Sequence, residues 1–310
     1  MTYLITGGMG CIGAWVLKHL LERNARVVNF DLSEDRHRLD WLMSRDKQVA
    51  ITFVQGDLTD FEQVKVALQH HDITHVIHLA ALQVPMCKAN PVLGAQVNVT
   101  GTTNIFEAAR QTGISHVVYA SSIAVYGTAE DYPPGLLAED ALMLPQTLYG
   151  VYKVANEGTA RIYWQDHGIS STVLRPYTVY GVGRDQGLTS EPTKVMAAAA
   201  QGQDYAITFG GRMQFHFASD VARQFIHAAD HPLAGARGFN LGTPAVAVQT
   251  VADLLMQLRP GVTITVADKP LPFPEAADPA PLHNAFDSIY ETPLVDGITE
   301  TLAHFESLNG

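Results

Sequence analysis

Three glycines at three-residue intervals connect the first expected strand of this chain to its first expected helix. Gly7, Gly10 and Gly13 follow a short apolar run at 2–6 and open an amphipathic stretch at 11–23. Glycine allows a tight turn, and a helix N-terminus offers free N–H groups and the positive end of the helix dipole. A strand-to-helix turn alone would also favour glycine, but this context predicts a pyrophosphate site at Gly7, Gly10, Cys11, Ile12 and Gly13.

The rest of the first half alternates apolar β-rich runs with helical stretches. We expect strands at 2–6, 26–31, 49–55, 74–79, 116–120 and 169–174, and helices at 11–23, 35–46, 60–70, 90–112 and 149–167. Apolar strands separated by helices predict an α/β fold, a Rossmann-type doubly wound parallel sheet with ligands beyond the strands' carboxyl ends.

Proline and glycine become frequent after about residue 175, and further helices are expected near 187–201, 218–230, 248–258 and 294–307. An irregular excursion is expected around Pro272 to Pro281. We therefore predict a dinucleotide-binding domain at 1–175 plus about 215–245, and a smaller, mostly C-terminal substrate-binding lobe at about 176–214 plus 246–310.

Two acidic residues follow the second and third expected strands. Asp31 lies eighteen residues beyond Gly13, where a carboxylate accepts hydrogen bonds from a ribose diol and repels a 2′-phosphate. This favours NAD over NADP, although Arg36 and Arg38 follow closely. Asp57 is placed to reach the adenine edge or, alternatively, to form a turn or helix cap.

Composition excludes several other functions. Twenty basic and thirty-one acidic residues give a net charge of −11 without a basic cluster, so we expect neither nucleic-acid nor membrane binding. Thirteen scattered histidines show no metal-binding spacing, and no metal is expected. Cys11 and Cys87 are not expected to form a disulfide, and no signal-like segment is seen, so a cytoplasmic location is predicted.

A catalytic set is suggested by Tyr149 and Lys153, four residues apart on one helix face, and by two serines, Ser121 and Ser122, that end a strand. A tyrosine has an ordinary pKa near 10, which a nearby ammonium and an oxidised nicotinamide would both lower. Tyr149 would then act as base and a serine would orient the substrate oxygen.

Together these motifs resemble the extended short-chain dehydrogenase/reductase family, the NAD-dependent epimerases and dehydratases. The matching segments are 6–13, Asp31, 56–58, 78–81, 98–102, 121–127, 149–153 and 175–181, with weaker echoes at 219–222 and 297–298. The resemblance implies catalysis by Ser122, Tyr149 and Lys153, and a homodimer. It also implies that NAD is held by Leu58, Leu79, Ala80, Ala81, Asn98 and Pro176 besides Asp31, Asp57, Tyr149, Lys153 and the glycine turn.

Departures from the family's patterns narrow the reaction. The 4,6-dehydratases have Thr-Asp-Glu where this chain has Ser122-Ile123-Ala124, and neither Ile123 nor Ala124 can supply an acid or base for water elimination. Nucleotide-sugar epimerases usually have asparagine at Thr178 and an Arg-Asp pair at Met213-Gln214, where the arginine binds the substrate pyrophosphate. These departures disfavour a dehydratase and make a nucleotide-linked substrate less expected.

Three hypotheses remain. The first is a dehydrogenase of a small sugar, polyol or sugar acid that releases NADH, with substrate contacts from Ser121, Ser122, Thr178, Arg184 and Arg212; Arg175 is a further candidate for a carboxylate. The second is a nucleotide-sugar (UDP-sugar 4-) epimerase with tightly bound NAD. The third is a non-catalytic NAD-sensing protein, against which the intact serine, tyrosine and lysine argue.

Overall fold

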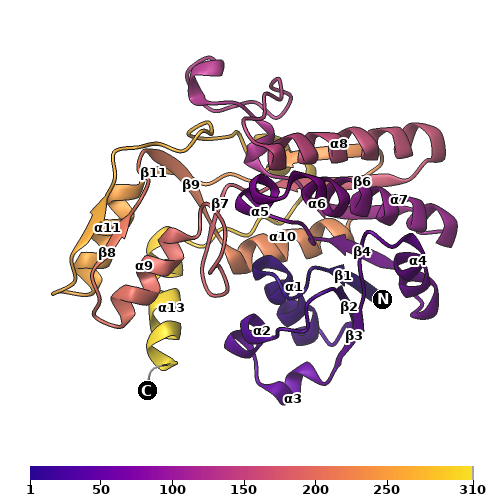
Figure 1. Cartoon of the computed structure of the whole chain (residues 1–310), viewed down its shortest axis with the longest axis horizontal. Helices are drawn as coiled ribbons and strands as arrows, with labels where there is room; N and C mark the ends of the chain where they lie inside the picture. The colour runs from indigo at the N-terminus through magenta and orange to yellow at the C-terminus, as the bar shows by residue number, and fades with distance from the viewer. Residues whose placement is uncertain (309–310) are drawn as a thin grey trace.

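The computed structural model describes residues 1–308 and centres on one seven-stranded sheet (Figure 1). Its strand order is β10-β6-β5-β4-β1-β2-β3, and every neighbouring pair is parallel. The predicted doubly wound α/β fold is confirmed. The strands are β1 (Thr2–Thr6), β2 (Arg26–Asp31), β3 (Ile51–Gln55), β4 (His75–His78), β5 (His116–Ala120), β6 (Ser170–Arg175) and β10 (Ala236–Asn240).

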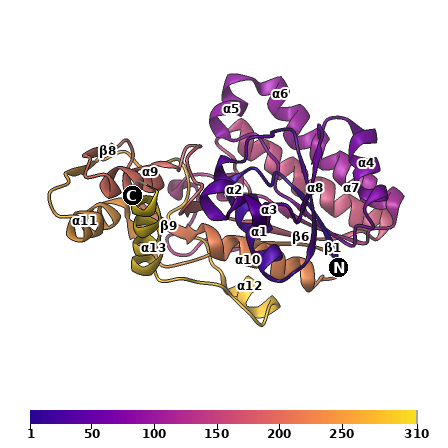
Figure 2. The same cartoon turned by 90° about the horizontal axis from the view of Figure 1, so that it is seen from below.

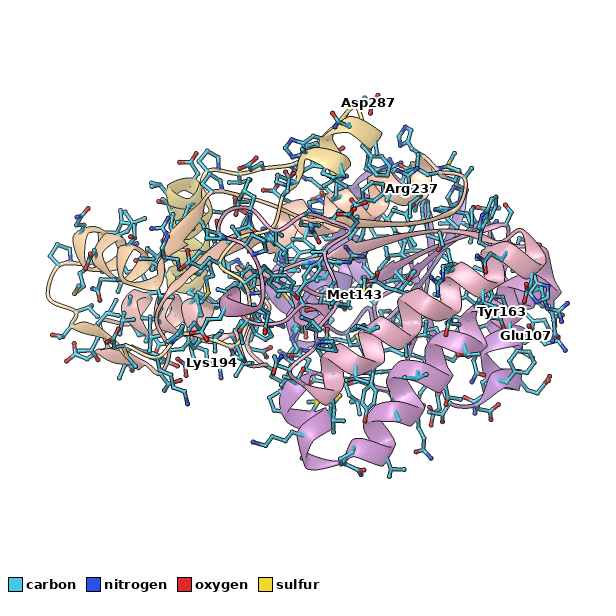
Figure 3. All side chains as sticks on the ribbon, turned by 90° about the horizontal axis from the view of Figure 1, so that it is seen from above. Glu107, Met143, Tyr163, Lys194, Arg237 and Asp287 are labelled. Carbon is cyan, nitrogen blue, oxygen red and sulfur yellow. The ribbon has the colours of Figure 1, made fainter. Side chains whose placement is uncertain are left out.

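Helices cover both faces of this sheet and bury the side chains of its strands on both sides, as expected for a parallel sheet. On one face α1 packs against α10, and on the other α4, α7 and α8 lie together. Tyr163 of α8 points at Glu107 of α7 and donates to it over 3.1 Å (Figure 3). The bounds are α1 (Cys11–Glu22), α2 (His37–Leu42), α3 (Arg45–Gln48), α4 (Phe61–His70), α5 (Val84–Ala89), α6 (Pro91–Ala95), α7 (Gly101–Thr112), α8 (Leu148–His167) and α10 (Ala218–Asp230).

The order of strands places the ligand crevice. Strand β1 pairs with β2 on one side and with β4 on the other, so the chain winds in opposite directions from this point. At such a switch point the loops after neighbouring strands separate and leave a crevice at their carboxyl ends. The glycine turn after β1 and the segments after β4 and β5 all open on this edge.

A smaller lobe lies beside the sheet, as Figure 2 shows for α9, α11 and α13. It has its own apolar core around Met196, Phe215 and Leu255. Its sheets are β11-β9-β7 and β12-β8. The elements are β7 (Thr178–Tyr180), α9 (Glu191–Ala200), β8 (Tyr205–Ile207), β9 (Arg212–Phe217), β11 (Ala245–Ala247), α11 (Val248–Leu258), β12 (Ile264–Val266) and α13 (Leu294–Ser307), while α12 (Ala280–Ala285) returns to pack beside β10 of the large sheet. The predicted residue ranges of the two domains stay a prediction.

Several expected elements differ in detail. The helix expected at 90–112 is divided by a π-helical segment (Gln96–Thr100) between α6 and α7, and the one at 35–46 forms α2 and α3. The helix expected from 187 begins at Glu191, where Pro192 occupies its first turn. The seventh strand, β10, was not expected, because Arg237 and Gly238 give it a poor β pattern. Short 3-10 turns, Ile123–Val125 and Ala129–Asp131, follow β5.

Candidate active site

The glycine turn brings backbone close to backbone. Gly7 has a left-handed φ of +75°, and a Cβ there would lie 2.6 Å from the Ala80 nitrogen. A Cβ on Gly13 would lie 2.1 Å from the Gly7 carbonyl oxygen. The Gly10 N–H donates to that same carbonyl over 3.0 Å, and α1 begins at the next residue. The turn therefore leaves the N-terminus of α1 open toward the crevice, as an anion-binding site needs.

Asp31 is fixed at the end of β2. Its two carboxylate oxygens accept from the Met9 N–H at 3.0 Å and from the Ser33 N–H at 2.9 Å, while burial raises its pKa. The two nearby arginines are occupied elsewhere. Arg36 stacks on Phe53, with its guanidinium carbon 3.7 Å from the ring centroid. Arg38 binds Asp185 and the Met9 carbonyl.

One cavity of about 500 Å³ runs along this edge of the sheet. It is lined by most of the residues predicted to bind the cofactor or substrate. These are Gly7, Gly10, Cys11, Ile12, Gly13, Asp31, Asp57, Leu58, Leu79, Ala80, Ala81, Ser121, Ser122, Tyr149, Lys153, Pro176 and Arg184. Asp57 also forms a turn, since its Oδ1 accepts from the Thr59 N–H over 2.8 Å; the cap of α4 is Asp60.

Local packing brings the end of β5 and the start of α8 together. Thr147 caps α8 by accepting from the Gly150 N–H over 3.0 Å. A Cβ on Gly150 would lie 2.1 Å from the Ala124 carbonyl oxygen, so only glycine permits this approach. The result places Tyr149 beside Ser122, and these two side chains share a hydrogen bond. Ser121 also faces the cavity, but its hydroxyl has no partner within residues 1–308.

Lys153 lies one turn further along α8 and is almost fully buried. Its Nζ donates to the Ala120 carbonyl over 2.7 Å and lies 5.5 Å from the centroid of the Tyr149 ring. Burial disfavours its charge and lowers the pKa of Lys153 to about 8. This ammonium is therefore close to Tyr149 but tied to the backbone.

Burial has the largest effect on the pKa of the Tyr149 hydroxyl. It raises the pKa of Tyr149 to about 12, opposed by the positive charge of Arg184 and by the hydrogen bond with Ser122. The expected lowering by Lys153 is not found, because desolvation of the hydroxyl outweighs the nearby cations. Without a further positive charge, Tyr149 is protonated at neutral pH.

Three predicted site residues lie away from the cavity lining. Asn98 is buried in the π-helical segment and holds both backbone groups of Leu82, at 2.7 and 2.9 Å, so it supports the wall indirectly. Thr178 is buried, with its hydroxyl donating to the Met213 sulfur over 3.1 Å. Arg212 is about half exposed and donates to the Ala245 carbonyl over 2.7 Å.

Arg175 is a structural residue. Its guanidinium pairs with both oxygens of Glu157, at 3.0 and 2.6 Å, and donates to the Tyr126 hydroxyl and the Glu139 carbonyl. Both members of this ion pair are buried. Every nitrogen of its guanidinium is engaged within the protein, and the residue does not line the cavity.

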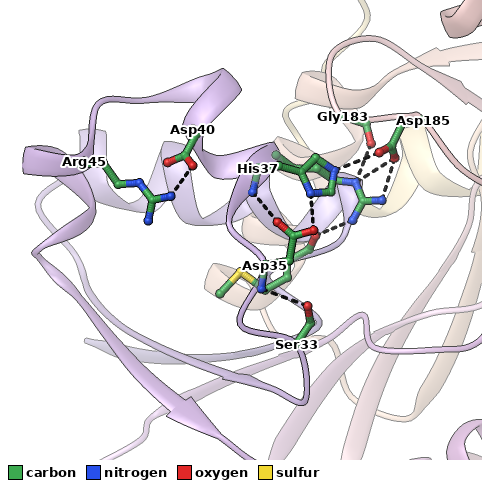
Figure 4. Close-up of polar contacts among 9 residues, drawn as sticks. Ser33, Asp35, His37, Asp40, Arg45, Gly183 and Asp185 are labelled. Carbon is green, nitrogen blue, oxygen red and sulfur yellow. Dashed lines mark hydrogen bonds and ion pairs between the residues drawn. The ribbon is translucent and has the colours of Figure 1, made fainter.

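Sequence reasoning missed the loop contacts that close the cavity. Asp185 accepts from Arg38 at 2.7 Å and contacts the His37 Nε2 at 2.9 Å, while Arg38 also donates to the Gly183 carbonyl (Figure 4). Gln83 and Thr189 line the wall beside Arg184, and Phe273, packed against Tyr177, also lines the cavity. Gln83 lies two residues after the 78–81 motif and could have been found from it; Thr189 and Phe273 come from irregular loops with no sequence signal.

Other kinds of site find no support in the part of the chain that the structure describes. No cluster of three His, Cys, Asp or Glu side chains there is arranged to hold a metal ion. None of the helices described is long and apolar enough to span a membrane. Cys11 and Cys87 are both free thiols.

Comparison with known proteins agrees with this geometry. Residues 3–242 match the NAD dependent epimerase/dehydratase family. A UDP-glucose 4-epimerase from Mycolicibacterium smegmatis is 30% identical over 259 residues, 78% of this chain and 77% of that protein. The structure of a Thermus thermophilus UDP-glucose 4-epimerase in complex with NAD covers 98% of this chain and 99% of its own, with a TM-score of 0.83 and 27% identity.

An L-threonine dehydrogenase from Cupriavidus necator shares the fold. Its structure covers 98% of this chain and 99% of its own, with a TM-score of 0.84 and 24% identity. The same architecture is thus found in a sugar-nucleotide epimerase and in an amino-acid dehydrogenase. The fold leaves the reaction open, and the side chains at the site must decide it.

Proposed function

This chain belongs to the NAD-dependent epimerase/dehydratase family, and we propose that it oxidises a secondary alcohol of a small sugar, polyol or sugar acid. NAD is the cofactor of that family. The observation that carries the proposal is that one and the same cavity is lined by the glycine turn and by Ser122, Tyr149 and Lys153. A proton-transfer set at one end and a dinucleotide cradle at the other are the two parts that alcohol oxidation needs.

The residues present fit NAD. The pyrophosphate would lie on Gly7, Gly10 and the N-terminus of α1, where any Cβ on Gly7 or Gly13 would collide with backbone. Asp31 would accept from the adenosine ribose, and Lys153 would hold the nicotinamide ribose. Because Arg38 is paired with Asp185, it is not free to attract a 2′-phosphate, which supports NAD over NADP.

The chain's own residues would handle the proton. Ser122 orients the substrate hydroxyl, and Tyr149 takes its proton as the carbinol carbon loses its hydrogen and its two bonding electrons. When bound, NAD supplies the acceptor for that hydride and, in its oxidised form, a positive charge that favours the phenolate. Burial raises the pKa of Tyr149 to about 12, so Tyr149 depends on such added charge to act as a base near neutral pH.

The smaller lobe supports a substrate without a nucleotide. Met213 and Gln214 stand where family epimerases place an arginine and its partner, and both are buried within the lobe. Gln214 bonds the backbone of Thr243 and Ala277. Arg212, the neighbouring cation, pairs with Glu275 outside the cavity lining. The phosphate contact expected of a nucleotide-sugar enzyme has no equivalent at these positions.

A UDP-sugar 4-epimerase is the second candidate, favoured by the likeness to the two UDP-glucose 4-epimerases over most of the chain. In that reaction the hydride returns to the same substrate and no NADH accumulates. The two candidates therefore differ in a directly measurable product.

The test is to incubate the purified protein with NAD and a panel of sugars, polyols and sugar acids while recording absorbance at 340 nm. UDP-glucose is followed in parallel for conversion to its 4-epimer. We expect NADH formation from the panel, and Tyr149→Phe to lower kcat by about 100- to 10,000-fold.

Tyr152→Phe is the matched control, since Tyr152 lies on the same helix as Tyr149 but donates its hydroxyl to the Pro91 carbonyl of α6 and does not line the cavity. It should leave kcat within a few-fold of the wild type. Epimerisation of UDP-glucose without NADH release would replace the proposal by the second candidate. No activity in either assay, together with an unchanged Kd for NAD in Tyr149→Phe, would favour a sensing role instead.

We also propose that the protein is a cytoplasmic homodimer. Two free cysteines suit a reducing compartment, and exposed apolar side chains gather on the neighbouring helices α6 and α8, among them Val92, Leu148 and Val151. Light scattering should give twice the chain mass, and Val151→Asp should shift it toward the monomer.

A further inference from the structure

We propose that Arg184 binds a carboxylate of the substrate, so that the substrate is a hydroxy acid of the sugar-acid type and not a neutral sugar or polyol. This inference rests on the proposed function and specifies its substrate class. It arises from a positive charge in the cavity wall that has no carboxylate partner among residues 1–308.

The hydrogen-bond partners of Arg184 are neutral. Its two terminal nitrogens donate to Gln83 Oε1 over 3.5 Å and to Thr189 Oγ1 over 3.0 Å. Its Nε is buried and has no hydrogen-bond partner anywhere in residues 1–308. A guanidinium has five N–H groups, and leaving one of them buried and unsatisfied is costly unless a ligand completes the set.

The other arginines near the active site show what a structural role looks like. Arg38 is bound to Asp185 and Arg175 to Glu157, each by two donors. Asp185 is adjacent to Arg184 in sequence, but its carboxylate binds Arg38 and His37 (Figure 4). The carboxylate closest to Arg184 in sequence is therefore already bound by other side chains.

The loop around Arg184 is built to hold this arrangement. Gly187 has a left-handed φ of +104°, and a Cβ there would lie 1.9 Å from Gln83 Oε1. Glycine at this position lets Gln83 approach the loop and support the guanidinium. Thr189 is buried, and its hydroxyl accepts a hydrogen bond from the other terminal nitrogen of Arg184. Arg184 thus has a fixed position, which favours recognition of a planar oxyanion.

Its position relative to the catalytic set fits one molecule spanning both. Arg184 lines the same cavity as Ser122 and Tyr149, and its charge acts on the Tyr149 hydroxyl. A carboxylate on Arg184 would direct the carbinol of the same substrate toward Tyr149. Gln83 and Thr189 would contribute polar contacts to the carboxylate or to a neighbouring hydroxyl.

The pyrophosphate of NAD offers the same oxyanion chemistry, so the experiment separates the two ligands. Matched acid and neutral probes are D-glycerate with glycerol and D-gluconate with D-glucitol. Turnover is measured with NAD, and binding of each acid to the protein–NADH complex is measured by calorimetry. Dissociation constants for NAD are measured separately on wild type, Arg184→Met, Arg184→Lys and Arg212→Met.

We expect wild type to prefer at least one acid over its neutral partner by about tenfold or more in kcat/KM, as a charge-assisted contact to a carboxylate allows. Arg184→Met should lose that preference while its Kd for NAD changes less than about threefold. Arg184→Lys should recover part of it, because charge remains but the guanidinium fork is lost. Arg212→Met, altered outside the cavity lining, should match wild type.

A rise in the Kd for NAD in Arg184→Met, with acid preference retained, would assign Arg184 to the pyrophosphate and overturn the inference. Equal use of acids and neutral partners by wild type, or no calorimetric binding of either acid, would also overturn it. If acids bind in an Arg184-dependent way but no alcohol is oxidised, the carboxylate site stands and the proposed oxidation fails.

Discussion

The two ends of the cavity are built in different ways. At the cofactor end the structure relies on the backbone: glycine at 7 and 13, the free N-terminus of α1, and Asp31 held by two N–H groups. At the substrate end it relies on side chains from separate segments, with Gln83 after β4, Arg184 and Thr189 after β7, and Phe273 from a distant loop. The cofactor end requires few particular side chains, whereas the chemistry of the substrate end depends on the identity of each side chain in its wall.

This difference predicts that the two ends tolerate substitution to different degrees. A backbone cradle is kept as long as the glycines and the strand-to-helix turn are kept. A wall assembled from loops changes its chemistry with single substitutions and leaves the sheet intact. The chain has the glycine turn, and under the proposed function the buried Met213 stands where a nucleotide-sugar epimerase would have its phosphate-binding arginine.

The largest expected effect comes from breaking the cofactor end. Gly13→Ala puts a Cβ against the Gly7 carbonyl, whose backbone cannot move without opening the turn. We expect the Kd for NAD to rise more than about 1000-fold, equivalent to about 4 kcal/mol. Gly158→Ala in α8 is the control, because its Cβ would meet open space; helix propensity predicts about 1 kcal/mol of added stability. Equal NAD affinity in the two variants would contradict the backbone-built cradle.

Next in size is the loss of the buried ion pair outside the cavity. Arg175→Met leaves Glu157 buried without its partner, and we expect the free energy of unfolding to fall by about 3–5 kcal/mol. Chemical denaturation with urea measures it. The ratio of acid to neutral turnover should stay unchanged in the folded fraction. A change in that ratio at full stability would show that Arg175 belongs to the substrate end after all.

A smaller effect concerns pH and links the two ends through Tyr149. Arg184 lowers the pKa of Tyr149, so Arg184→Met should raise it. A base must be deprotonated, and the rising limb of the kcat–pH profile should therefore move to higher pH. With a neutral alcohol as substrate, activity at a fixed pH on that limb should fall a few-fold, since each pKa unit is worth about tenfold. An unshifted limb would separate Arg184 from the catalytic hydroxyl.

The smallest effect is expected at the loop contact between the ends. Asp185→Asn weakens the bonds from Arg38 and His37, and we expect a loss of about 1–2 kcal/mol of stability near neutral pH. The pKa of Asp185 is lowered in the folded protein by these partners against its burial. Its contribution is therefore present above about pH 4 and lost as the pH falls through the lowered value. Unfolding curves of wild type and variant should converge in acid and differ at neutral pH.

Much of the fold and the cofactor end could be predicted from local pattern. The six strands from β1 to β6, the glycine turn and Asp31 each depend on residues near one another in the chain, so period and turn chemistry suffice. Strand β10 could not be predicted, because its parallel pairing with β6 compensates for Arg237 and Gly238 in its sequence. The position of Asn98, which holds Leu82 from within a π-helical segment, was equally invisible.

The sequence by itself determined the Rossmann-type fold, the NAD cradle and the presence of a serine, a tyrosine and a lysine suited to proton transfer. Only the tertiary structure decided which arginine is free. Arg175, Arg184 and Arg212 look alike in the sequence, but one is paired with Glu157, one faces the cavity and one lies on the surface. The physical reason is that an arginine can bind a ligand only if no carboxylate of the protein already pairs with it, and the residues that could pair with it come from segments far apart in the chain.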